Sequence, residues 1–136
     1  MAVKIMTRWG YVQTNWQMKG IEYALSKGAI ISNHSYGGSM VDTATKTNYN
    51  NLAYNNPNHL FIYAAGNSNK VIDSSYPEFG CALEMITQIC VAASTYKSEK
   101  AYFSNTGKQM VHVFAPGDSI ESTTYYWYPD DDDYRK

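Results

Sequence analysis

The sequence predicts an α/β fold built around parallel strands, and two observations support this prediction. Short apolar runs end abruptly in small-residue turns, most clearly at 60–69, where the run stops at Gly66 and Asn67. Such bounded runs are typical of strands that are buried on both faces of a sheet. A helix-length segment separates two of these runs, and a strand–helix–strand connection of this length places both strands parallel in one sheet. One domain is expected, because 136 residues leave little room for a second core.

A helix and a strand are the first predicted elements. Asn15 can cap a helix that runs to about Lys27, and Gly28 can supply its left-handed stop. A strand is expected at 29–35, because this run is β-branched at its start and ends in the tight loop Tyr36-Gly37-Gly38. The apolar stripe of the helix consists of Met18, Ile21, Ala24 and Leu25.

A second helix and three further strands follow. The helical pattern at 42–55 is weaker, and Pro57 closes it. Strands are predicted at 60–65, 88–93 and 110–114. The carboxyl ends of parallel strands share one edge, so the loops that follow the first two strands should lie close together. That edge is where open α/β sheets usually bind ligands.

Charge and hydropathy argue against several classes of binding partner. The formal net charge is −1 and the basic residues do not cluster, so neither nucleic acid nor an anionic membrane surface is an expected partner. No apolar window reaches the roughly eighteen residues that a membrane span requires. The N-terminus also lacks the charged-then-apolar layout of a signal peptide.

Cys81 and Cys90 fit neither a disulfide-dense scaffold nor a four-ligand zinc site. Cys90 lies within the apolar run 89–93, where a thiol usually acts as a small buried hydrophobic group, and this is the favoured interpretation. A Cys81–Cys90 disulfide is the alternative, since a loop can approach a strand closely enough to form one.

The three histidines, His34, His59 and His112, show no metal-ligand spacing, so we expect structural roles for them and no metal site. His34 and Ser35 are neighbours, but adjacent residues of a strand point to opposite faces. A base and nucleophile pair of these two side chains is therefore not expected.

The acidic and aromatic segment at about 124–136 contains four consecutive aspartates, 130–133. Such charges repel one another, which favours a solvated tail or loop. Calcium binding is the alternative, although no spaced loop of the EF-hand kind is present.

Two blocks of the sequence carry a recognisable pattern: residues 30–38 end in Ser-Tyr-Gly-Gly, and residues 62–67 end in Ala-Ala-Gly-Asn. They resemble the strand that ends in Ser-x-Gly-Gly and the Ala-Ala-Gly-Asn strand of the subtilisin-like serine proteases, the subtilases. The resemblance covers nearly the whole chain from the first helix to Thr123 and implies a three-layer α/β fold, with a mostly parallel sheet and helices on both faces. Further blocks follow in the family's order at 76–77, 89–93, 103–107, 113–117 and 120–123.

The resemblance implies a role for each of these segments. Asn67 corresponds to the oxyanion-hole asparagine, and Ser35-Tyr36-Gly37 to the segment whose backbone pairs with an extended substrate. Ala64-Ala65-Gly66 corresponds to one wall of the primary specificity pocket, and Ser75 lies near its floor. The alternative is that Asn67 and the paired glycines at 37–38 only supply turn geometry.

The family's three catalytic motifs, Asp-x-Gly, His-Gly-Thr and Gly-Thr-Ser-Met-Ala, do not occur in the chain. By family spacing the Asp and His would precede Met1 and the Ser would follow Lys136. We therefore expect residues 1–136 to be the middle section of a peptidase domain. Its partners would be the remaining segments of that domain and a polypeptide substrate.

The alternative function is a peptide-binding pseudoprotease or regulatory module that keeps the groove without the triad. A nucleotide-binding domain is disfavoured, because the turns at 36–39 and 66–69 lack the glycine spacing that binds phosphate. No cofactor is expected, and the family's structural calcium sites cannot be assigned to residues of this chain. Secretion is favoured only by the resemblance.

Overall fold

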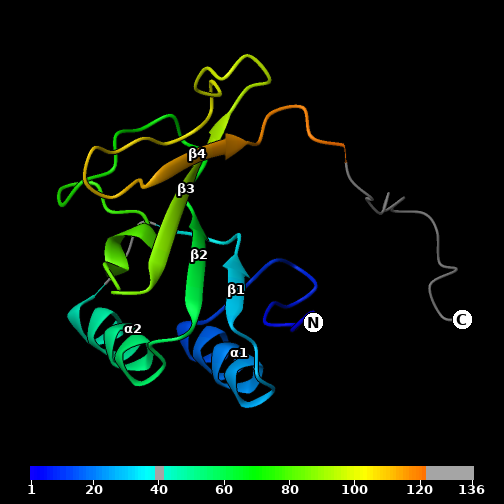
Figure 1. Ribbon diagram of the computed structural model, residues 1–136, viewed down its shortest axis with the longest axis vertical. Helices are drawn as coiled ribbons and strands as arrows, with labels where there is room; N and C mark the ends of the chain where they lie inside the picture. Colours follow the sequence, from blue (N-terminus) through cyan, green and yellow to red (C-terminus); the bar gives the residue numbers. More distant parts are fainter. Residues whose placement is uncertain (39–41, 122–136) are drawn as a thin grey trace, which may run out of the picture.

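The computed structural model describes residues 1–38 and 42–121. A four-stranded sheet with the order β1-β2-β3-β4 forms its centre (Figure 1). Within the described ranges, no helix is both long and apolar enough to cross a membrane. The acidic segment predicted at 124–136 lies outside the described residues. The elements are α1 (Thr14–Ser26), β1 (Ile31–His34), α2 (Thr43–Asn55), β2 (Leu60–Ala64), the 3₁₀ turn η1 (Cys81–Leu83), β3 (Gln88–Ser94) and β4 (Val113–Pro116).

All neighbouring strands of the sheet are parallel, so the predicted α/β class is confirmed. The prediction of a strand at 110–114 was wrong in its boundaries, since β4 begins at Val113. The N–H of Val111 bonds the carbonyl of Gly107 at 3.1 Å, in a turn that ends just before β4. The sheet ladder therefore starts later than the apolar pattern indicates.

Both predicted helices are present. The predicted cap at Asn15 was wrong, because α1 begins at Thr14 and its N-cap is Gln13, which makes no side-chain capping bond. Gly28 adopts the predicted left-handed conformation with φ +80°. At the start of α2, the carboxylate of Asp42 accepts a hydrogen bond from the N–H of Thr45 at 2.6 Å, which satisfies one of the free donors of the first turn.

The described helices pack on one face of the sheet. Phe61 and Tyr63 of β2 are fully buried and belong to the same core as residues of α1 and α2. The helices lie side by side (Figure 1), and the buried hydroxyl of Tyr49 on α2 donates to Oε1 of Gln17 on α1 at 2.8 Å. On the opposite face, Ile62 is only half-buried. The apolar run of β2 predicts burial on both faces of the sheet. Within the described residues, only the face that packs on the helices is fully buried.

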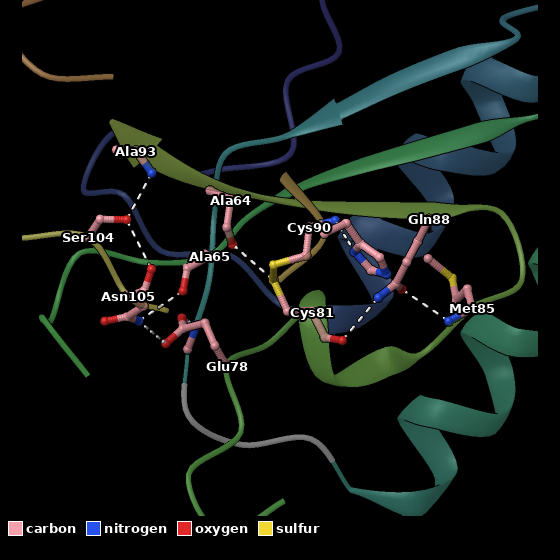
Figure 2. Close-up of a disulfide and its surroundings, with 12 residues drawn as sticks. Ala64, Ala65, Glu78, Cys81, Met85, Gln88, Cys90, Ala93, Ser104 and Asn105 are labelled. Atoms are coloured by element: carbon pink, nitrogen blue, oxygen red, sulfur yellow. Dashed lines mark hydrogen bonds between the residues drawn. A yellow bond between two sulfur atoms is a disulfide. The ribbon is translucent and has the colours of Figure 1, made fainter. Parts of the chain in front are cut away.

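Cys81 and Cys90 form a disulfide, with their Cα atoms 5.3 Å apart. The favoured sequence interpretation, a free buried thiol at Cys90, was therefore wrong, although Cys90 is fully buried. The turn that begins η1 brings Cys81 beneath the sheet, where its Sγ atom lies 3.5 Å from the carbonyl oxygen of Ala64 (Figure 2). The disulfide thus fixes η1 against β3, next to the end of β2.

Candidate functional site

A shallow cavity of about 210 Å³ lies at the carboxyl edge of the sheet and contains most of the predicted site. Its lining includes Ser35 from the end of β1 and the segment Ala64-Ala65-Gly66-Asn67 from the end of β2. The parallel order of β1 and β2 explains why these loops meet at one edge. Tyr36, Gly37 and Ser75 do not line this cavity.

The side chain of Asn67 is exposed at this edge, three residues after the end of β2. Among the hydrogen bonds of the described residues, none involves the Asn67 amide. Its NH₂ group is therefore available to a ligand, whereas the backbone on either side of it is held in place.

Asn105 holds the backbone on both sides of Asn67. Its Nδ2 donates to the carbonyl of Ala65 at 2.8 Å, and its Oδ1 accepts from the N–H groups of Ser68 and Lys70, both at 3.0 Å. The N–H of Asn105 also donates to the carbonyl of Gly66 at 3.0 Å. Because Asn105 is only 1% exposed, these bonds are protected from water. We call this arrangement the Asn105 clamp.

The Asn105 clamp is tied to the sheet by its neighbour. The Ser104 hydroxyl accepts a hydrogen bond from the N–H of Ala93 on β3 at 2.8 Å and donates to the carbonyl of Asn105 at 3.0 Å (Figure 2). Both residues stand in the block at 103–107 that carries part of the resemblance, and neither had a predicted role. No local pattern could assign one, since the partners of Asn105 are 35–40 residues away in the chain.

The segment Ser35-Tyr36-Gly37 lies on the neighbouring side of the edge. Ser35 is exposed, and its hydroxyl accepts from Nδ2 of Asn33 at 2.8 Å. A Cβ atom on Gly37 would collide with a carboxylate oxygen of Glu78. The close approach expected at Gly37 is therefore made by the Glu78 side chain in this structure.

Ser75 lines a second cavity, of about 430 Å³, together with Ser68 and Glu78. The N–H of Ser75 donates to Oδ1 of Asp73 at 2.7 Å, which shapes a local turn. Ser75 is thus close to the loop after Asn67, although it faces a different hollow from the one at the sheet edge.

Tyr36 belongs to a chain of side chains that hydrogen bonds join to His34, Ser32 and His59. The bond between His59 and the carbonyl of Ala29 decides which atom donates in each of the others. His59 Nδ1 must donate to the carbonyl of Ala29 at 2.8 Å, so its Nε2 accepts from the Ser32 hydroxyl at 2.8 Å. Ser32 in turn accepts from Nε2 of His34 at 2.6 Å, and Nδ1 of His34 accepts from the Tyr36 hydroxyl at 2.6 Å. Every ring nitrogen in this chain therefore has a partner. We call it the His34 chain.

Burial favours the neutral form of His34. Burial, and to a smaller extent the neighbouring His59, lower the pKa of His34 to about 4. Burial also raises the pKa of the Tyr36 phenol. Sequence analysis weighed Ser35 as a partner of His34, but the hydroxyl that contacts His34 is that of Ser32, two residues earlier on the same face of β1.

His112 has a separate role at the sheet. Its Nδ1 accepts from the N–H of Cys90 at 2.9 Å, just before β4 begins. In the part of the chain that the structure describes, no three His, Cys, Asp or Glu side chains group closely enough to hold a metal ion.

Comparison with known proteins identifies the family. The model of the subtilase family, Peptidase S8, matches residues 1–132. The chain belongs to the subtilase family. The relatives in this family that it resembles are serine proteases, which agrees with the resemblance of the Ser-x-Gly-Gly and Ala-Ala-Gly-Asn blocks.

Individual relatives show how much of a subtilase the chain represents. Subtilisin E of Bacillus subtilis is 32% identical over 122 residues, which are 90% of this chain and 31% of that protein. Subtilisin-like protease 7 of Arthroderma otae is 38% identical over 129 residues, 90% of this chain and 30% of that protein. The chain therefore spans about a third of the length of these relatives.

Solved structures show the same fold. The crystal structure of a cold adapted subtilisin-like serine proteinase superimposes with a TM-score of 0.71 at 24% identity, and covers 88% of this chain and 41% of that one. The parallel sheet and its helices are thus those of a subtilisin-like α/β domain, of which the chain is one part.

Proposed function

We propose that the chain supplies the oxyanion-stabilising and substrate-binding part of a serine endopeptidase, with Asn67 as the oxyanion donor. The observation that carries this proposal is the contrast at Asn67 itself. Its amide is exposed and free, while the backbone beside it is held by the Asn105 clamp. A donor that is fixed before substrate binds costs little reorganisation in the transition state.

The chemical role of such a donor is specific. When a nucleophile attacks a peptide bond, the carbonyl oxygen gains negative charge, and an N–H donor at that point stabilises this charge more than the neutral substrate. The edge segments Ser35-Tyr36-Gly37 and Ala64-Ala65-Gly66 would hold the extended substrate through their backbone groups, as in β-strand addition.

The nucleophile and base of this mechanism come from other segments of the domain. Ser32 contacts two histidines, but these atoms are occupied within the His34 chain, and His34 and His59 are 4% and 3% exposed. Because every ring nitrogen of the two histidines has a partner within this chain, none is free to act as a base on a substrate. We therefore expect that the chain alone does not react with a serine-directed fluorophosphonate; stoichiometric labelling of one serine would contradict the proposal.

The role of Asn67 is tested in a polypeptide that joins this chain to flanking segments carrying the Asp, His and Ser motifs. Asn67→Ala should lower kcat by roughly 10²–10³, which is the magnitude known for the equivalent donor in subtilisin itself. The KM should change little, because the lost interaction forms mainly in the transition state.

Asn58→Ala is the matched control, since Asn58 is also exposed and lies just before β2, at its opposite end. Unchanged turnover in Asn67→Ala would refute the role of Asn67. A joined polypeptide that binds peptides but never cleaves them would favour the pseudoprotease alternative.

A further inference from the structure

The carboxylate of Glu78 lies between the two glycine-containing segments of the proposed substrate site. On one side, the N–H of Gly38 donates to Glu78 Oε1 at 2.9 Å. On the other side, a Cβ atom on Gly66 would lie 3.0 Å from Cδ and 3.1 Å from Oε2 of Glu78. Because Gly37 and Gly66 lack side chains, the carboxylate fits between the two backbones.

The surroundings of Glu78 include polar groups and leave part of the carboxylate open. Oε2 lies 3.5 Å from Nδ2 of Asn105, at the edge of hydrogen-bond distance (Figure 2). Glu78 also lines the cavity of about 430 Å³ that contains Ser68 and Ser75. A carboxylate can accept about four hydrogen bonds, so acceptor positions remain for a ligand in this cavity.

No cation of the described residues neutralises Glu78 directly. Within residues 1–38 and 42–121, the one ion pair closer than 4.0 Å joins Lys46 to Glu84 and does not involve Glu78. Lys70 lines the same cavity without pairing to Glu78. Partial burial raises the pKa of Glu78, which the Gly38 N–H and the charge of Lys70 oppose. A half-buried, unpaired carboxylate is costly, and a cationic ligand would remove that cost.

We propose that Glu78 is a specificity-determining residue that selects a lysine or arginine side chain immediately before the scissile bond. This inference rests on the proposed function, because it assigns the substrate class of the same site. The Glu78 carboxylate occupies the gap between the glycine backbones and also lines the cavity of about 430 Å³. The charged end of a long side chain that entered this cavity would therefore meet the carboxylate. Ser68 and Ser75 supply further oxygen acceptors for the remaining N–H groups.

The test compares two acetylated tetrapeptide amides, Ala-Ala-Pro-lysine and Ala-Ala-Pro-norleucine, which differ in the terminal ammonium group. Their dissociation constants for the 136-residue chain are measured by NMR titration in low salt. The lysine peptide should bind roughly tenfold more tightly than the norleucine peptide, as expected for one charge-assisted contact. Salt should weaken only the lysine peptide.

Glu78→Gln should reduce this preference to less than about twofold, because the amide keeps an oxygen for the Gly38 N–H but carries no charge. Glu22→Gln removes an equal charge from an exposed position on α1 and should keep the preference. If Glu78→Gln does not fold, as judged by its amide spectrum, the comparison of the two peptides on the unchanged chain still decides.

The outcomes separate this inference from the proposed function. Equal binding of the two peptides, or tighter binding of norleucine, overturns the role of Glu78 and leaves the substrate groove intact. Tighter binding of a peptide with alanine at the last position would show that the carboxylate blocks the gap, and also overturns it. Binding of neither peptide overturns both the charge selection and the groove.

Discussion

Two polar clusters lie beside this sheet, the His34 chain along β1 and the Asn105 clamp after β2, and they differ in one respect. In the His34 chain, every ring nitrogen of His34 and His59 has a hydrogen-bond partner. At the β2 end, the Asn105 clamp satisfies the backbone around Asn67 but leaves the Asn67 amide free. A cluster with histidine and serine therefore serves structure, whereas a lone amide on a fixed loop is available for chemistry.

The largest effect on stability is expected from breaking the Asn105 clamp. Asn105→Ala leaves the N–H groups of Ser68 and Lys70 and the carbonyl of Ala65 without their protein partner. The free energy of unfolding should fall by roughly 3 kcal/mol, since each lost partner costs about 1 kcal/mol or more. Urea unfolding measures this change.

The same variant tests whether the two clusters are independent. NMR signals of 65–70 should move in Asn105→Ala, while those of His34 and His59 should not. Asn58→Ala should change the free energy of unfolding by less than about 0.5 kcal/mol. Equal losses of unfolding free energy in the two variants would show that the Asn105 clamp stabilises the fold no more than an exposed asparagine does.

The second effect is a pH dependence that belongs to the His34 chain. The pKa of His34 is about 4 in the folded chain, below its ordinary value of 6.5, so the unfolded chain binds a proton more readily. The stabilisation is complete above pH 6.5 and is lost as pH falls from about 6.5 to 4. The loss reaches at most roughly 3 kcal/mol.

Urea unfolding at a series of pH values checks this prediction. His34→Gln should flatten the dependence between pH 4 and 6.5, whereas Asn58→Ala, at an exposed position without a titratable group, should keep it. If His34→Gln retains the full dependence, other groups are responsible and the neutral form of His34 is not required.

The smallest effect is expected at the end of the His34 chain. Tyr36→Phe removes the hydroxyl that donates to Nδ1 of His34 and should lower the free energy of unfolding by about 1 kcal/mol. Tyr96→Phe is the matched control, since Tyr96 is 86% exposed. A fall in stability with unchanged signals for 65–70 would sharpen the distinction between the clusters. Movement of those signals would show that Tyr36 couples them.

Most elements of the fold could be predicted from local patterns. The strand at 60–65 follows from a short apolar run that ends in a turn, the stripe on α1 from side-chain periodicity, and Gly28 from the conformational freedom of glycine. The first capping residue and the start of β4 were misplaced, because each is decided by a few backbone hydrogen bonds that many sequences can satisfy. The disulfide was not favoured, since two cysteines in a sequence do not show whether their Cα atoms meet.

In the candidate site too, some residues could be predicted from the sequence and others could not. Asn67 and the glycines beside it stand in contiguous blocks, so their resemblance to a protease family was readable from the chain, and their roles stay predictions. Asn105 and Glu78 could not be assigned, because their partners are at least 27 residues away in sequence.

By itself, the sequence determined that strands would alternate with helices and that a small-residue turn would end in an amide. Periodicity and backbone freedom are local properties, and they act before distant segments meet. Only the tertiary structure decided that Asn105 holds this turn, that Ser32 joins two histidines and that Glu78 enters a gap between glycines. These contacts depend on the packing of segments from different strands, which fixes distances that no local pattern contains.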